Sequence, residues 1–388
     1  MSRLEAAGCY VHIPFCDRIC PYCDFAVVRL QEQRVDRYLR SLHAEIAAAR
    51  TFDRVVDTLY LGGGTPSALR ADQIAQLLAA LFAKFGAPPG SIECTLEANP
   101  ARNCDDLDRW RAAGVTRLSV GVQSLDDAEL RRLGRAHCAS DAAKFLQAAR
   151  AAGFQNVSLD LIAGAPGQTI ASFERTLRAA IACAPDHVSV YGLQIEPQTP
   201  YAAWHDRDPG LFPDDDAVAA ALELADELLG TAGYRHYELS NFALPGRECA
   251  HNRKYWTQAD CFAFGMSAAG YDDGLRYRNL RSLDAYCDAL TQGMPVREEE
   301  ERLEFPQRIG EAAVLALRTA DGLENDDFLR RFGVRTAHIF AAACKRCSAM
   351  GLLEVDETGA RLTARGRLLA NSVCAEFLVP DMHPDVVT

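Results

Sequence analysis

Three cysteines near the start of the chain have the type and spacing that bind metal. Cys16, Cys20 and Cys23 lie in the stretch YVHIPFCDRICPYCDF and follow the pattern C-x3-C-x2-C. Three thiolates can bind three irons of a [4Fe–4S] cube and leave the fourth iron open to another ligand. Zinc is the alternative metal, but structural zinc sites take four ligands, and no second cysteine pair is spaced to complete such a site. We therefore predict a [4Fe–4S] cluster at these cysteines.

A glycine run follows the second apolar segment of the chain. Residues 55–61 are rich in β-branched side chains, and Gly62, Gly63 and Gly64 end this run before Thr65. Glycines leave backbone carbonyls exposed close to a ligand, although a lone glycine run also makes ordinary turns. Its position directly after a strand, downstream of the cysteines, favours a ligand-binding role.

Six apolar segments alternate with amphipathic segments over the first half of the chain. The predicted strands span 9–13, 55–61, 92–97, 117–122, 157–162 and 187–191, and the predicted helices span 35–50, 74–85, 107–113, 142–152 and 170–184. This alternation is typical of right-handed β-α-β crossovers and a parallel sheet. Six units cannot close an eight-stranded barrel, so we predict an α/β fold built on an open, partial barrel.

Chemically capable residues fall at the C-terminal ends of the predicted strands. They are Cys16, Gly63, Glu97, Gln123 and Asp160. Parallel barrels place their active sites at the C-terminal ends of the strands. We therefore expect these five residues to lie around one mouth of the barrel, where they could bind a common ligand.

The second half of the chain predicts two further units. A proline-rich connector at 197–213 precedes a helix at 214–229, and strands or extended segments at 234–242 and 261–271 cover the barrel. Helical segments follow at 309–317, 323–332, 337–350 and 365–377, with a hairpin signal at 356–359. Helices followed by a hairpin are similar to a winged-helix unit. We predict three domains: a barrel with the cluster at 1–235, a covering segment at 236–302 and a winged-helix-like domain at 303–388.

Composition limits the partners and the compartment. The net charge is −12 and the isoelectric point is about 5.3, which argues against a nucleic-acid-binding surface. Winged-helix units often bind DNA, but this one has few clustered basic residues, so we expect a lid or a partner surface. No apolar run is long enough to span a membrane. Fourteen cysteines without a signal peptide indicate a cytoplasmic protein with reduced thiols. Any membrane role would be peripheral, through a partner.

Several motifs carry a resemblance to a known family that extends over nearly the whole chain. They are YVHIPFC…CPYCDF at 10–25, LGGGTPS at 61–67, LEANP at 96–100, GVQSL at 121–125, LGRAH at 133–137, LDLIAGAPGQT at 159–169 and HNRKYW at 251–256. They resemble the radical S-adenosylmethionine (SAM) superfamily, in the branch that contains the oxygen-independent coproporphyrinogen dehydrogenases (HemN) and the heme chaperones (HemW). The sequence is most similar to the HemW family. The resemblance implies a (β/α)6 radical SAM barrel.

The resemblance also implies which residues contact SAM. SAM would chelate the open iron of the cluster and lie across the barrel mouth. The positions that match SAM-contacting positions of the branch are Tyr10, Tyr22, Gly63, Gly64, Thr65, Glu97, Gln123, Arg135 and Asp160. Arg135 can bind a carboxylate through two hydrogen bonds. Glu97 and Asp160 can accept hydrogen bonds from ribose hydroxyls.

Two departures weigh against the HemN activity, the oxidative decarboxylation of coproporphyrinogen III. HemN-type proteins carry a further cysteine where this sequence has Phe25. They also have a long N-terminal extension that shapes the substrate pocket, and only fifteen residues precede Cys16 here.

The HNRKYW stretch suggests a heme site. Its imidazole, His251, and its aromatic rings, Tyr255 and Trp256, could line a flat apolar pocket and ligate heme iron. The alternative is a packed histidine beside buried aromatic residues. A further departure is Ala269, where relatives usually carry His.

The sequence therefore favours a heme chaperone, monomeric or dimeric, that binds heme and passes it to acceptors such as respiratory enzymes, with SAM cleavage possible. Oxygen-independent coproporphyrinogen III dehydrogenase, or another HemN-like radical SAM enzyme such as a methyltransferase, is the alternative. The shared barrel core separates these functions poorly. A second pair of cysteines, Cys344 and Cys347, lies in a predicted helix, where core packing is the simpler interpretation.

Overall fold

The computed structural model describes residues 6–50, 54–100 and 104–381. The outer ends of the predicted first and third domains, residues 1–5 and 382–388, lie outside the described residues. Within the described part, no helix is both long and apolar enough to cross a membrane.

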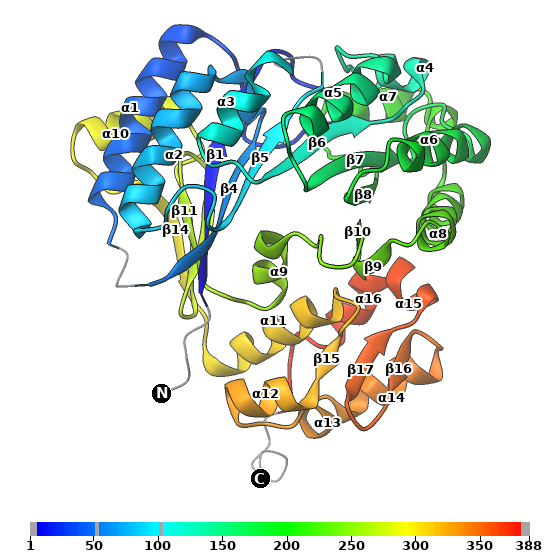
Figure 1. The fold of residues 1–388 in the computed structure, drawn as a ribbon. Helices are drawn as coiled ribbons and strands as arrows, with labels where there is room; N and C mark the ends of the chain where they lie inside the picture. The colour runs from blue at the N-terminus through cyan, green and yellow to red at the C-terminus, as the bar shows by residue number, and fades with distance from the viewer. Residues whose placement is uncertain (1–5, 51–53, 101–103, 382–388) are drawn as a thin grey trace.

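A twelve-stranded sheet forms the centre of the molecule (Figure 1). Six consecutive parallel strands make up its middle: β1 (Ala7–Ile13), β4 (Val56–Gly63), β5 (Glu93–Ala98), β6 (Arg117–Gln123), β7 (Val157–Ala163) and β8 (His187–Gly192). The sheet has two free edges, at β14 and β9, and does not close on itself. The predicted partial barrel is therefore confirmed.

Helices cover the outer face of the parallel strands. They are α1 (Glu32–Ala48), α2 (Ala71–Phe85), α3 (Leu107–Ala112), α5 (Ala139–Ala151), α6 (Ile170–Ala182) and α8 (Asp215–Thr231). In α2 the buried residues Ile74, Leu77, Leu78 and Leu81 recur at helical spacing, so one apolar stripe faces the sheet. The helix ends at Gly86, whose positive φ of 66° suits the left-handed position that follows a helix.

Four α-helices of the described residues lie where the sequence predicted none, among them α9 (Ala250–Trp256) and α10 (Leu283–Thr291). The short α4 (Asp127–Arg132) follows β6, and α7 (Pro200–Arg207) lies inside the predicted connector at 197–213. The prediction of a connector without a helix was wrong at this place. Pro200 occupies the first turn of α7, where proline is favoured, and Tyr201 beside it is fully buried.

The segments predicted to cover the barrel instead extend the sheet at both edges. On one side, β10 (Asn241–Ala243) pairs antiparallel with β8, and β9 (Arg235–Glu238) lies beyond it. On the other side, β11 (Cys261–Phe264) pairs parallel with β1 and is followed by β12 (Ala269–Asp272), β13 (Leu275–Asn279) and β14 (Arg297–Arg302). The boundaries of the first two domains stay a prediction.

The C-terminal region has its own apolar core and follows the predicted order of helices and hairpin. It contains α11 (Phe305–Leu317), β15 (Leu323–Glu324), α12 (Asn325–Phe332), α13 (Thr336–Ile339), α14 (Ala341–Ala349), β16 (Leu353–Val355), β17 (Gly359–Leu362), α15 (Ala364–Leu368) and α16 (Ala370–Ala375). Phe328, Phe340 and Phe377 are among its fully buried residues. The predicted last helix, 365–377, is in fact divided at Leu369 into α15 and α16.

A close approach in this core predicts an unusual effect of adding one methyl group. Gly310 lies inside α11, and a Cβ there would overlap the backbone carbonyl of Leu378. Gly310→Ala should therefore lower stability by about 1–3 kcal/mol through overpacking, although glycine-to-alanine changes in helices normally add about 1 kcal/mol.

The matched control is Gly230→Ala in α8, where a Cβ would meet no atom within 4 Å. This variant should be as stable as the wild type or more stable. Thermal unfolding of the two variants checks the pair, and a Gly310→Ala protein that melts with the wild type would contradict the packing argument.

Candidate functional site

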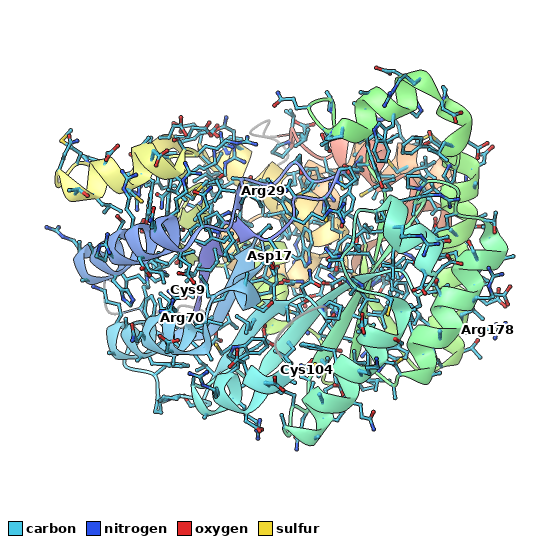
Figure 2. All side chains as sticks on the ribbon, turned by 90° about the horizontal axis from the view of Figure 1, so that it is seen from above. Cys9, Asp17, Arg29, Arg70, Cys104 and Arg178 are labelled. Atoms are coloured by element: carbon cyan, nitrogen blue, oxygen red, sulfur yellow. The ribbon has the colours of Figure 1, made fainter. Side chains whose placement is uncertain are left out.

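The cysteine loop is closed at its base by a pair of short strands. β2 (Phe15–Cys16) pairs with β3 (Val28–Arg29), and the loop between them carries Cys20 and Cys23. Backbone hydrogen bonds from Gly64 N to Ile13 O (2.8 Å) and from Thr65 N to Phe15 O (2.9 Å) fix this base to the glycine run. Figure 2 shows Asp17 and Arg29, which flank the loop, near the centre of the molecule in the view from above.

The three predicted cluster ligands lie close enough to affect one another. Burial raises the pKa of Cys16. Burial, with repulsion from Cys16 and Cys20, raises the pKa of Cys23 to about 11. All fourteen cysteines are free thiols. Among the described residues, no group of three or more His, Cys, Asp or Glu side chains is already arranged as a metal site. Three neighbouring soft donors in one loop fit an iron–sulfur cluster chemically, and their role as its ligands stays a prediction.

The glycine run is required by the approach of the cysteine segment. Gly63 has a φ of 114°, and a Cβ there would lie 2.5 Å from the ring of His12. A Cβ on Gly64 would lie 2.8 Å from the backbone of Pro14. The hydroxyl of Thr65 lies 3.5 Å from Cys16 Sγ. The glycine run therefore lies directly beside the cysteine loop, and its predicted contact with SAM stays a prediction.

Two carboxylates face the barrel interior from β5 and β7. Glu97 accepts hydrogen bonds from Tyr60 OH (2.9 Å) and Gly63 N (3.0 Å). Asp160 accepts hydrogen bonds from Ser119 (3.3 Å) and Ser158 (3.4 Å). Burial raises the pKa of Glu97 to about 7, and burial also raises the pKa of Asp160. Each acid is therefore poised for a polar or cationic partner.

Arg135 links the end of β6 to the cysteine loop. Its Nη2 donates to Gly121 O (2.6 Å), and its Nη1 lies 3.7 Å from Cys20 Sγ. Its Nε is buried and has no hydrogen-bond partner among the described residues. Gln123 ends β6 after a register shift and has a φ of 69°, which turns the chain at this mouth. Tyr22 packs against the α7 ring of Tyr201 at 5.9 Å.

Tyr10 lies deeper in the barrel. Its hydroxyl is hydrogen-bonded to His12 Nδ1 (3.0 Å), and its ring stacks on Tyr60 with centroids 6.1 Å apart. The structure thus brings Tyr10 next to Glu97 through the shared neighbour Tyr60.

His251 lies away from the cysteine loop, in the short helix α9 (Ala250–Trp256). It is fully buried, and its ring lies 5.1 Å from that of Tyr60. Its Nδ1 is hydrogen-bonded to Thr58 and its Nε2 to Tyr255, each at 2.9 Å. Burial lowers its pKa to about 3, so the imidazole is neutral at physiological pH. Heme ligation through His251 would require one of these hydrogen bonds to break.

The sequence analysis missed a ladder of polar side chains that fills the barrel. It consists of Thr58 and Tyr60 on β4, Arg117 and Ser119 on β6, and His187 on β8. The sequence did contain a signal for these polar residues. They alternate along parallel strands, which are normally apolar because both of their faces are buried. Arg117 is only 2% exposed, although arginine is rarely buried.

Comparison with known proteins gives a consistent result. Residues 10–180 match the model of the radical SAM superfamily, and residues 304–369 match the HemN C-terminal domain. The heme chaperone HemW of Bacillus subtilis is 35% identical over 95% of this chain and 98% of its own length. HemW of Escherichia coli is 32% identical over 97% of this chain and 100% of its own length.

The fold comparison points to the same branch. The solved structure of coproporphyrinogen III oxidase (HemN) from Escherichia coli, a radical SAM enzyme, has a TM-score of 0.84 and 28% identity. The match covers 97% of this chain and 91% of that one.

The raised pKa of Glu97 predicts a pH dependence of stability. Between pH 4.5 and about 7 the folded protein holds a proton that the unfolded chain has released, so the stability falls as the pH rises through this range. Glu97→Gln lacks this titration. The stability of the wild type relative to the variant should therefore be higher at pH 5 than at pH 8, by on the order of 2–3 kcal/mol.

Urea denaturation of both proteins at the two pH values measures this difference. Glu174→Gln, an exposed pair partner of Arg178 on α6, serves as the control and should show no such change. An equal difference for Glu97→Gln at pH 5 and pH 8 would show that Glu97 titrates normally.

Proposed function

Because the chain belongs to the HemW family of radical SAM proteins, we propose that it is a heme chaperone that binds heme and delivers it to acceptor hemoproteins. The observation that carries this proposal is the match to HemW relatives over nearly the full length of both chains. Respiratory enzymes are the class of acceptor that we propose. The free thiols suit a reducing compartment such as the cytoplasm.

The radical SAM family implies a [4Fe–4S] cluster and SAM, and we assign their binding to residues at one mouth of the barrel. Cys16, Cys20 and Cys23 would hold the cluster. When bound, a cluster with an open iron supplies an electron that can cleave SAM. The residues that would bind SAM are Tyr10, Tyr22, Gly63, Gly64, Thr65, Glu97, Gln123, Arg135 and Asp160.

Individual contacts support this assignment. The buried carboxylates of Glu97 and Asp160 suit the hydroxyls and positive charge of SAM, because burial leaves each acid short of water. The unpartnered Nε of Arg135 leaves a donor for a carboxylate, next to the thiol of Cys20.

We propose the HNRKYW segment as the place where heme docks. Tyr255 is 37% exposed, and its hydroxyl is the partner of the buried imidazole of His251. A flat apolar ligand would reach Tyr255 first. Displacement of the Tyr255 hydroxyl would free Nε2 of His251 as an axial ligand. Ala269, at the start of β12, offers no imidazole for this purpose.

A decarboxylase of coproporphyrinogen III is the second candidate, because the HemN structure shares the fold over nearly the whole chain. Phe25 argues against it. Its side chain is 66% exposed beside the cysteine loop, where the HemN pattern has a further cysteine.

A cysteine variant tests the proposed cluster ligands. Cys20→Ala should lose the iron and the visible absorbance of the anaerobically reconstituted protein, since a cube with two protein ligands is poorly held. Cys344→Ala, which removes a half-buried thiol of α14, is the matched control and should keep the full iron content. Retention of four irons per chain in Cys20→Ala would contradict the assignment of Cys20 as a cluster ligand.

A second test separates chaperone from enzyme. The reconstituted protein should retain heme, and it should form no protoporphyrinogen IX from coproporphyrinogen III in the presence of SAM and reductant. Decarboxylation needs reacting atoms about 3–3.5 Å apart, and an error of about 1 Å can cost about a hundredfold in rate. Catalytic formation of protoporphyrinogen IX would contradict the chaperone proposal.

The heme ligand is tested on the same samples. His251→Gln can still form a hydrogen bond to Thr58 but offers no imidazole, so heme retention should fall. His338→Ala, at an exposed position in α13, should bind heme as the wild type does. Normal retention by His251→Gln would remove His251 from the heme site without affecting the chaperone proposal.

A further inference from the structure

A hollow lies at the end of the parallel strands that is opposite the cysteine loop. It has a volume of about 340 Å³ and is lined by Glu93, Arg111, Thr116, Arg117, Gln155, Asn156 and Arg247. Glu93 and Arg117 are the first residues of β5 and β6, and Asn156 immediately precedes β7. The hollow therefore opens at the N-terminal ends of the strands, and none of the predicted SAM or cluster residues lines it.

The cationic residues of this hollow lack carboxylate partners. Among the described residues, no carboxylate forms an ion pair with Arg111, Arg117 or Arg247. Arg117 is 2% exposed, and its buried Nε has no hydrogen-bond partner in the described part of the chain. Burial disfavours its charge, but Cys249, Glu93 and nearby tyrosines outweigh this effect and raise its pKa, so the guanidinium stays charged. Acids near Arg117 thus stabilise its charge at a distance, but its guanidinium forms no ion pair among the described residues and keeps donors for an added anion.

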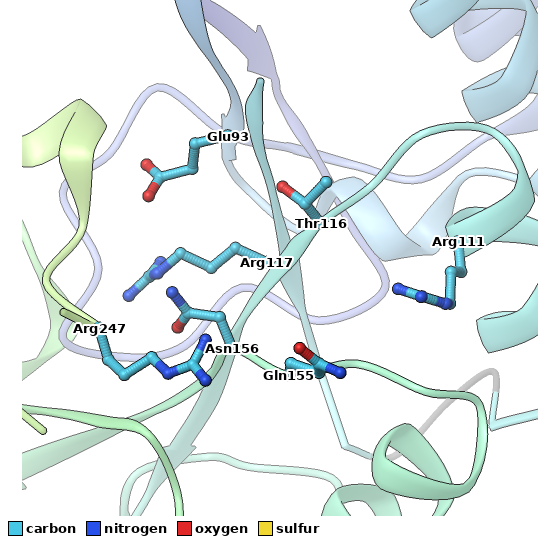
Figure 3. Close-up of a pocket in the computed structure, with 7 residues that line it drawn as sticks. All are labelled: Glu93, Arg111, Thr116, Arg117, Gln155, Asn156 and Arg247. Carbon is cyan, nitrogen blue, oxygen red and sulfur yellow. The ribbon is translucent and has the colours of Figure 1, made fainter. Parts of the chain in front are cut away.

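Among the described residues, one acid lines the hollow, and its carboxylate already has hydrogen-bond partners. Glu93 accepts hydrogen bonds from the backbone nitrogens of His251 (2.9 Å) and Ala250 (3.0 Å) at the start of α9. Its carboxylate therefore holds α9 in place and forms no ion pair with Arg117. Figure 3 shows the guanidinium groups of Arg117 and Arg247 facing the amide of Asn156, with Arg111 approaching from the other side.

Asn156 adds an unpartnered polar group to the same place. Its buried Oδ1 has no hydrogen-bond partner among the described residues, and rotation of the amide by half a turn would present Nδ2 instead. A neighbouring hollow of about 370 Å³ shares Arg247 and adds Arg150. Arg150 is already paired with Asp186 at 2.7 Å, so it does not need an added anion.

We propose that this hollow binds a phosphate dianion, either free or as a small phosphomonoester. Two guanidinium groups around one amide match a phosphate, because each guanidinium can donate two parallel hydrogen bonds to its oxygens. The volume lies at the small end of the range for ligand pockets, so the ligand is a compact one. The proposal does not rest on heme binding or on the proposed chaperone function.

Calorimetric titration of the cluster-loaded protein tests the site. Inorganic phosphate and glycerol 3-phosphate are titrated separately in a phosphate-free buffer with about 0.1 M sodium chloride, which screens nonspecific attraction. We expect saturable binding of one phosphate group per chain. Tighter binding of glycerol 3-phosphate identifies a phosphomonoester as the ligand, and equal or weaker binding identifies free phosphate.

Arg247→Gln is the informative variant, since Arg247 lies in a surface loop and its removal leaves the barrel interior intact. Its affinity for phosphate should fall about tenfold or more, the usual loss for a charged hydrogen bond. The control is Arg178→Gln, which changes an arginine at the periphery of the molecule (Figure 2) and should bind as the wild type does. The proposal is overturned if the wild type shows no saturable binding, or if Arg247→Gln binds as tightly as the wild type or Arg178→Gln is weakened equally.

Discussion

One buried charge, that of Arg117, interacts with acids along the barrel interior. Arg117 lies inside the sheet with 2% exposure and lowers the pKa of both Glu97 and Asp160, against the larger opposing effect of burial. On its other side is Glu93, whose carboxylate holds the first turn of α9. The interior of this open, six-stranded barrel is not filled by apolar side chains alone. The polar side chains on β4, β6 and β8 occupy part of it. Loss of the arginine would leave buried acids without their shared cation, which is strongly destabilising.

Much of this fold could be predicted because the parallel strands are apolar and bounded by glycine or polar residues. The strands at the edges could not. β14 reads REEEER and is exposed throughout, so it carries no apolar signal. Charged side chains of this kind are common on the edge strands of sheets. α7 lies in a proline-rich segment that the sequence analysis took for a connector, although Pro200 is well suited to the first position of a helix.

The candidate site divides in the same way. Cysteine spacing and the glycine run are local signals, and the structure brings Gly64 and Thr65 into contact with the cysteine segment. Contacts that depend on tertiary packing left no local signal. The sequence could not show that both nitrogens of His251 have partners in the barrel, because Thr58 lies far away along the chain. It also could not show that Arg135 reaches Cys20 across the barrel mouth.

The two ends of the barrel interior have opposite electrostatic character. Glu97 lies near the C-terminal end of β5 and Asp160 at the middle of β7, and Arg117 and Arg247 face the hollow at the N-terminal end. Arg117 interacts with both sets, so the ends are not electrostatically independent. An anion beside Arg117 would offset part of its charge and thereby raise the pKa of Glu97 further. A cation beside Glu97 would favour ionisation of that acid, and an ionised Glu97 would weaken anion binding at the far end. By linkage, each ligand must alter the affinity of the other by the same factor.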